Sequence, residues 1–179
     1  MNQALPDPPL PSAMDEYRSL RDETLKRVDL RSQILSFTLA FAASMLTLGL
    51  GANAYRSALL IYPIIAFFFA VGFAYNTLML IEIGSYIRTI ESRIPGLGWA
   101  GYLKTRYGGI EPFEVFSYAG LFLGTQFIAI ALYDSFGLPL TRVDAIVRNL
   151  SLAALVGTLL TIVYAMVYHQ LVLRQKPKT

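Results

Sequence analysis

The sequence contains no cysteine and only one histidine, His169, among its 179 residues. The lack of cysteine excludes disulfides, thiolate nucleophiles, iron–sulfur clusters and cysteine-ligated zinc. A single histidine does not make a metal site, because structural and catalytic sites need several ligands. The chain also lacks a glycine-rich phosphate loop, an acid–base–nucleophile combination and an internal repeat. We therefore expect no enzyme activity, no cofactor and no metal.

Charged residues are also scarce, at 15% of the chain against about 25% in an average soluble domain. The deficit falls in four uncharged apolar stretches, each long enough to cross roughly 30 Å of hydrocarbon. The sequence therefore predicts an all-α, integral-membrane four-helix bundle in a single domain, 12–179. Before it, the proline-rich residues 1–11 are predicted to be a disordered tail. The predicted spans are 32–55, 57–81, 115–133 and 149–173.

The positions of lysine and arginine predict how the spans are oriented. Five of these residues precede the first span, four lie between the second and third, and three follow the fourth, whereas only Arg56, Arg142 and Arg148 lie on the other side. Basic residues favour the cytoplasmic side of a membrane. The sequence thus predicts a multi-pass protein of the inner (plasma) membrane with both termini in the cytoplasm. No cleaved signal peptide is expected, since no basic segment leads into an apolar core near the start.

Two spans are predicted to extend into the cytoplasm as helices. Residues 12–31 form a helix continuous with the first span, and 82–114 begin with a helical extension of the second. Its apolar periodicity runs to Ile94 and stops at Pro95 and Gly96. We expect the two extensions to pair as a stalk. The alternative is that 12–31 is a solvated juxtamembrane helix.

After that stop, aromatic residues alternate with basic ones: Trp99, Tyr102 and Tyr107 with Lys104 and Arg106. This mixture is typical of a segment that lies among lipid headgroups. The same residues could instead stack on and neutralise a nucleotide or oligonucleotide.

A few residues within the spans are candidates for a pore or gate: Asn76, Thr77, Gln126 and Phe68. Polar groups at depth in a membrane often serve function, and a phenylalanine can form a hydrophobic constriction. The alternatives are hydrogen bonds between helices for Asn76 and Gln126, and packing or lipid contact for Phe68.

Small residues predict where helices approach closely. Gly120 and Gly124 form a GxxxG pattern, and Ser44 and Thr158 lie on similar small-residue faces. This packing occurs either within one bundle or between subunits. Four spans are too few to enclose an aqueous pore within one chain, so we expect a homo-oligomer surrounded by membrane lipids.

The segments EYRSLRDETLKRVDLRSQ, LIYPIIAFFFAVGFAYNTLMLIEIGSYIRTIE and PGLGW, within 17–99, resemble small bacterial four-span membrane effectors of anti-phage conflict systems. The nearest type is the channel effector of the Hailong system. The resemblance implies an oligomeric ion channel that depolarises the host membrane on a cytoplasmic signal.

Under this hypothesis the partner is a nucleotide or oligonucleotide signal, or a soluble defence protein; double-stranded nucleic acid is not expected. The alternative is that the basic residues only obey the positive-inside rule and touch anionic lipid. A non-conducting scaffold that recruits a soluble partner is the other functional hypothesis. The candidate ligand or lipid contacts are Arg18, Arg21, Lys26, Arg27, Arg88 and Arg93.

Overall fold

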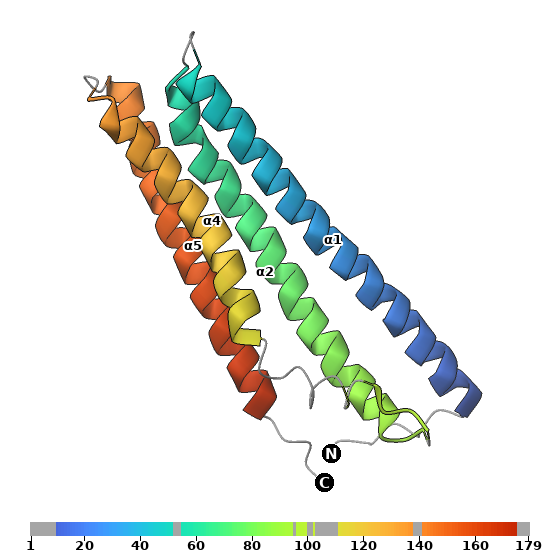
Figure 1. Ribbon diagram of the computed structural model, residues 1–179. Coiled ribbons are helices and arrows are strands. Elements are labelled where there is room, and N and C mark those ends of the chain that lie inside the picture. The colour runs from blue at the N-terminus through green and yellow to red at the C-terminus, as the bar shows by residue number, and fades with distance from the viewer. Residues whose placement is uncertain are drawn as a thin grey trace.

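The computed structural model describes residues 10–51, 55–94, 96–99, 102, 111–137 and 141–174. They form four helices of alternating direction: α1 (Leu10–Leu50), α2 (Ser57–Glu91), α4 (Glu111–Ser135) and α5 (Arg142–Arg174) (Figure 1). The prediction of an all-α helical bundle is confirmed.

The central helix is α2, which packs against α1, α4 and α5. Its buried side chains run from Ala58 to Asn76, where its three neighbours cover it, and recur from Ile87 to Glu91. Aromatic and aliphatic side chains from α4 complete this core, with Phe122 only 1% exposed. The buried apolar residues of α2 are Ala58, Leu59, Leu60, Tyr62, Pro63, Ala66, Ala70, Phe73, Ile87 and Ile90.

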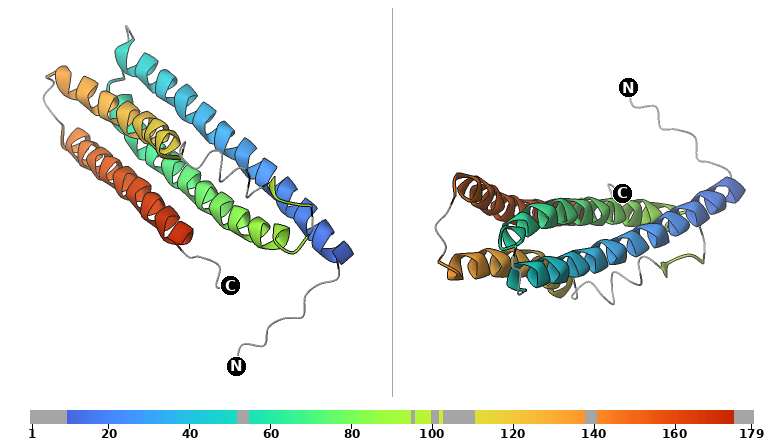
Figure 2. Two further views of the ribbon diagram at one scale, coloured as in Figure 1. Left: turned by 60° about the horizontal axis from the view of Figure 1, so that its bottom comes forward. Right: turned by 90° about the horizontal axis from the view of Figure 1, so that it is seen from above.

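At one end of the bundle, α1 and α2 project together beyond α4 and α5 (Figures 1 and 2). These projecting parts are the amino-terminal portion of α1 and the carboxyl-terminal portion of α2. They coincide with the two helical extensions that the sequence predicts. The bundle therefore has a four-helix part and a two-helix part.

The first helix begins and ends earlier than predicted. It starts at Leu10 rather than at residue 12, since Pro11 fits in the first helical turn, where its missing N–H needs no partner. Residues 1–9 of the predicted tail lie outside the described residues. The helix ends at Leu50, before the predicted limit of residue 55, because the chain bends at Gly51 and Tyr55 N donates to Leu48 O at 3.0 Å.

The limits of the later helices also differ from the prediction. The helical extension of α2 ends at Glu91, and single turns carry the chain on to Ile94. The third predicted span begins in the structure at Glu111 rather than at 115, and it continues to Ser135.

The last helix begins at Arg142 rather than at 149 because Thr141 and Asp144 cap it. Thr141 Oγ1 accepts from the Asp144 backbone N–H at 3.1 Å, and the Asp144 carboxylate accepts from the Thr141 N–H at 3.3 Å. These reciprocal bonds satisfy donors that a helix start leaves open. Gly137, at a φ of 57°, supplies the left-handed residue just after α4.

Among the described residues, three helices are long and apolar enough to cross a membrane: Ser12–Leu50, Ser57–Glu91 and Arg142–Leu171. The predicted third span, in α4, is not one of them. The first two residues of that predicted span, 115 and 116, have side chains outside the described part of α4. Length and composition thus suggest membrane association for three of the four predicted spans.

Candidate functional site

The projecting parts of α1 and α2 are joined by reciprocal tyrosine–glutamate hydrogen bonds. Tyr17 Oη donates to Glu91 Oε1 at 3.2 Å, and Tyr86 Oη donates to Glu16 Oε1 at 2.8 Å. Each helix supplies one tyrosine and one glutamate, as the opposite directions of the helices allow. Glu91 is only 5% exposed, which makes its hydrogen bond more valuable than one in water. The two predicted extensions therefore do lie in contact.

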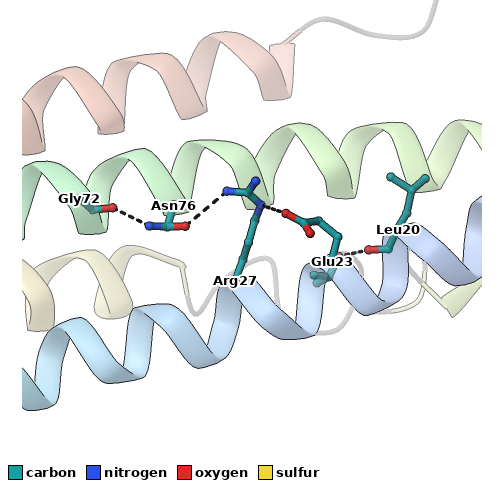
Figure 3. Close-up of polar contacts among 6 residues, drawn as sticks. Leu20, Glu23, Arg27, Gly72 and Asn76 are labelled. Atoms are coloured by element: carbon teal, nitrogen blue, oxygen red, sulfur yellow. Dashed lines mark hydrogen bonds and ion pairs between the residues drawn. The ribbon is translucent and has the colours of Figure 1, made fainter.

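Further along α1, Arg27 bridges to α2 (Figure 3). Its Nη1 donates to Asn76 Oδ1 at 3.4 Å, and its Nε lies 2.8 Å from Glu23 Oε1. Asn76 Nδ2 donates in turn to Gly72 O at 2.9 Å. Asn76 is thus buried at the α1–α2 contact, with its amide bonded on both sides.

One turn later, Arg31 of α1 lies against two aromatic rings. Its guanidinium carbon is 4.7 Å from the ring centroid of Phe73 on α2 and 5.2 Å from that of Tyr118 on α4. The two rings also contact each other, with centroids 4.5 Å apart. A guanidinium over an aromatic face is attracted by the negative charge of that face. This contact holds three helices together near the point where the four-helix part gives way to the two-helix part.

A second set of polar contacts links α2, α4 and α5. Gln126 and Thr158 are both fully buried, and Gln126 Nε2 donates to Thr158 Oγ1 at 2.9 Å. Tyr62 Oη donates to Thr125 Oγ1 at 2.7 Å. Ser151 Oγ of α5 donates to the Leu60 carbonyl of α2. These side chains link helices within the chain, which is the alternative that the sequence left open for Gln126.

The other two pore or gate candidates are placed differently. Thr77 is half-buried, and its hydroxyl donates to Phe73 O of its own helix at 2.9 Å. Phe68 is 67% exposed on the side of the bundle and contacts the ring of Phe67. Phe68 is therefore free to meet lipid or another copy.

The small residues predicted for close packing are only partly used within the chain. Thr158 lies between α4 and α5, as described above. A Cβ added at Gly120 or Gly124 would meet no atom within 4 Å, so the GxxxG face of α4 is uncovered. Ser44 is exposed, and its hydroxyl donates to Ala40 O at 2.8 Å.

The basic residues predicted to meet a ligand or lipid do not share one environment. Arg27 is directed towards Asn76, and Arg21 Nη1 donates to Tyr17 Oη at 3.4 Å. Arg18 Nη1 lies 3.7 Å from Asp15 Oδ1, with both side chains largely in solvent. Four of these residues are exposed: Arg18, Arg21, Lys26 and Arg93. The other two, Arg27 and Arg88, are half-buried.

In the segment that follows α2, Trp99 and Tyr102 are stacked. Their ring centroids are 5.7 Å apart, at an interplanar angle of 24°. Both side chains are half exposed. Lys104, Arg106 and Tyr107, which the sequence grouped with them, lie outside the described residues.

The interior offers little room for a small molecule. A cavity of about 40 Å³ lies between α1, α2 and α4 against Met45, Tyr62 and Thr125. Ligand pockets usually need roughly 300 Å³ or more. Within the described ranges, no three or more His, Asp or Glu side chains are grouped as a metal site would require. The candidate sites are therefore surfaces and helix contacts rather than a pocket.

The outward faces of α5 and α1 differ in chemistry. Outward-facing residues of α5 are large and apolar, including Val156, Leu160, Val163 and Val167, each between 46% and 62% exposed. On α1 the side opposite the packed residues Thr38, Ala42 and Gly49 is small and hydroxylated instead. We call this the hydroxyl face of α1; it consists of the exposed residues Ser36, Ala40, Ser44 and Thr47.

The hydroxyl groups of this face are bonded to their own helix. Ser36 donates to Ser32 O at 3.0 Å and Thr47 donates to Ala43 O at 2.8 Å. Large apolar residues, Phe37, Leu39 and Leu48, flank the face. Sequence reasoning selected Ser44 of this face but could not tell that it points outward, because the sequence does not show which side of α1 packs on α2.

These features define an all-helical bundle with three helices of membrane-spanning length and apolarity. No family model, curated protein or solved structure matches the chain.

Proposed function

We propose that this chain is the subunit of an oligomeric channel of the inner membrane, with both termini in the cytoplasm and conduction controlled from that side. The apolar outer surface of α5 supports insertion, since so broad an exposed apolar surface is unfavourable in water. The distribution of lysine and arginine supports the orientation. The projecting part of α1 and α2 is then the cytoplasmic stalk.

Conduction by this protein requires several copies. The middle of the single bundle is filled by Tyr62, Phe122, Leu59 and Leu60, each no more than 1% exposed. Its buried polar side chains are hydrogen-bonded within the chain, as Gln126 is to Thr158 and Ser151 is to a backbone carbonyl. A water path would therefore run between copies, along a helix face that points outward.

The hydroxyl face of α1 is the observation that carries this proposal. Within a segment apolar enough to span a membrane, this face presents Ser36, Ser44 and Thr47 away from the bundle. Under this proposal the outward residues of α5, which are mainly valine and leucine, face lipid. Small hydroxylated residues are instead typical of helix–helix contacts in membranes, and their hydroxyl groups can also face water.

Control from the cytoplasm is supported by the contacts that hold α1 to α2. These contacts are polar, through Tyr17 and Glu91 in the stalk and through Arg27 and Asn76 next to it. A ligand that competes for Arg27 or for Glu91 would weaken the attachment of α1, the helix that carries the hydroxyl face. Such a ligand shifts a closed–open equilibrium only by its difference in affinity for the two states.

The alternative is a non-conducting scaffold, in which the hydroxyl face packs tightly against another helix. A role in anti-phage defence stays a prediction from the sequence resemblance. The two functional classes differ in whether water reaches the hydroxyl face, and this difference can be measured directly.

The experiment uses the absence of native cysteine, which makes every introduced thiol unique. Ser44→Cys places a thiol on the hydroxyl face, and Val163→Cys places one on the outward side of α5 as a control. Reconstituted protein is recorded in planar bilayers while a charged, water-soluble thiol reagent is added. We expect the reagent to change the conductance of Ser44→Cys and to leave that of Val163→Cys unchanged.

Two outcomes would contradict the channel. The first is absence of conductance from assembled wild-type protein, tested with and without added nucleotides. The second is conductance that responds at Val163→Cys but not at Ser44→Cys, which would place water elsewhere. Absent conductance combined with spontaneous Ser44→Cys disulfides between copies would favour the scaffold.

A further inference from the structure

The part of α1 that lies in the stalk and next to it carries exposed charges of both signs, with an exposed leucine among them. Arg18, Asp22, Lys26 and Asp29 are exposed, and Leu25 between them is 61% exposed. At about 100° per residue, these five residues lie within roughly 100° of the helix circumference. We call them the charged strip of α1.

The charged strip is continuous with the hydroxyl face. Arg18 and Ser36 are eighteen residues apart in the sequence, which is about five whole helical turns, so they point in the same direction. The opposite side of α1 is occupied by α2, through Tyr17 and Arg27. The strip therefore lies on the side of the stalk that faces away from the rest of the chain.

We propose that the charged strip is the contact by which a second copy of this chain docks in the cytoplasm. This inference rests on the proposed function in one respect: insertion in one membrane gives all copies the same direction, so the two α1 helices meet in parallel. Leu25, near the middle of the length of the strip, then lies near Leu25 of the other copy in an isologous contact. An exposed leucine gains hydrophobic stabilisation when a partner covers it.

The charges around Leu25 are complementary to themselves in this arrangement. Asp22 follows Arg18 by four residues, a rise of about 6 Å, which the long arginine side chain can bridge to the other helix. Lys26 lies between the levels of Asp22 and Asp29 and can reach either carboxylate of its neighbour. Each cross-helix pair then occurs twice, once in each direction, as in parallel coiled coils.

The same pattern of charges disfavours a nucleotide or an anionic lipid as the partner of the strip. The strip has two basic and two acidic side chains, so a nucleotide phosphate or an anionic lipid headgroup would meet Asp22 and Asp29 as well as Arg18 and Lys26. Like charges repel at this range. A second copy presents both signs in the required alternation, and it is present at the same membrane in equal amount.

The experiment measures cross-linking between copies of the full-length protein in vesicles. Leu25→Cys supplies the only thiol of the chain, and oxidation should join two copies into a covalent dimer. Thr89→Cys is the matched control, because Thr89 is also exposed in the stalk but lies on α2. We expect a dimer from Leu25→Cys and a much lower yield from Thr89→Cys.

Charge reversal then tests complementarity. On the Leu25→Cys background, Arg18→Glu with Lys26→Glu forms one variant and Asp22→Lys with Asp29→Lys forms the other. Each alone should lose dimer yield by about tenfold, because its attractive pairs become repulsive. Mixing the two variants before reconstitution should recover the yield, which also shows that both are folded.

Three results would overturn the docking contact: equal yields from Leu25→Cys and Thr89→Cys, yields insensitive to either charge reversal, or no recovery on mixing. Its failure is distinguishable from failure of the channel. Cross-linking as expected without conductance would retain the docking contact and reject the channel. Conductance with no specific cross-linking at Leu25 would retain the channel and reject the docking contact.

Discussion

The buried pair Gln126 and Thr158 predicts an asymmetry between two substitutions that remove the same hydrogen bond. Gln126 Nε2 donates to Thr158 Oγ1 at 2.9 Å, and both side chains are fully buried. Thr158 Oγ1 has a second bond, to Ala154 O at 3.0 Å within its own helix. The hydroxyl therefore keeps a partner when the glutamine is lost, whereas the amide loses its hydroxyl partner when the threonine is lost.

The magnitudes follow from this difference. Gln126→Leu removes the amide and fills a similar volume with apolar atoms, so it costs only the bond itself, about 0.6 kcal/mol on average inside a membrane. Thr158→Val keeps the shape of threonine but leaves the buried amide of Gln126 without its hydroxyl partner, which costs about 1–3 kcal/mol. The double variant removes both polar groups and should lie close to Gln126→Leu alone.

The assay is a double-mutant cycle on the free energy of unfolding, measured by denaturant titration in detergent micelles. Thr158→Val should unfold at the lowest denaturant concentration of the four proteins, and adding Gln126→Leu to it should restore stability. Equal losses from both single variants, or a double variant worse than either, would refute the reasoning. Planar-bilayer recording of Gln126→Leu adds a functional readout. Its conductance should match that of the wild type if Gln126 only links α4 to α5.

Two further predictions concern α1. Gly49→Ala should destabilise the bundle by about 1–3 kcal/mol in the same titration, since the added Cβ would lie 2.4 Å from Cγ of the fully buried Leu59. Gly84→Ala in α2 is the control. Its added Cβ meets no atom within 4 Å, so this variant should be neutral or slightly stabilising. Arg31→Met should lower the free energy of unfolding by about 0.5–2 kcal/mol through loss of its two ring contacts. Arg142→Met, at an exposed arginine, should leave it unchanged, and equal effects would contradict the cation–π assignment.

The sequence predicted the helices well and their ends less well. Long uncharged stretches have few alternatives to helix, so all four elements were foreseen. The start of α5 was missed although its signal was present, because Thr141 followed by Asp144 is a capping box with aspartate in place of glutamate. The end of α1 was missed because the uncharged stretch continues beyond Gly51, whereas the helix does not.

The residues of the candidate sites were easier to select than to pair. Asn76 and Gln126 stand out as amides in apolar sequence, but nothing local indicates that their partners are Arg27 and Thr158. Arg31 was counted only as a basic residue before the first span. Its contact with rings from α2 and α4 depends on tertiary packing.

The structure adds the side of the helix on which each residue lies, inward to the bundle or outward. This determines how the apolar surface is interpreted. Composition alone treats α1 and α5 alike, as two apolar helices with some serine and threonine. Once the packed sides are known, the polar residues of α5, Ser151 and Thr158, are found buried inside the bundle, whereas Ser44 and Thr47 of α1 point outward. Each of these hydroxyl groups donates to a carbonyl of its own helix, so contact with lipid would tolerate them but gain nothing from them. Contact with water or with another helix gives a reason to place them there, and under the proposed function a second copy beside α1 supplies it.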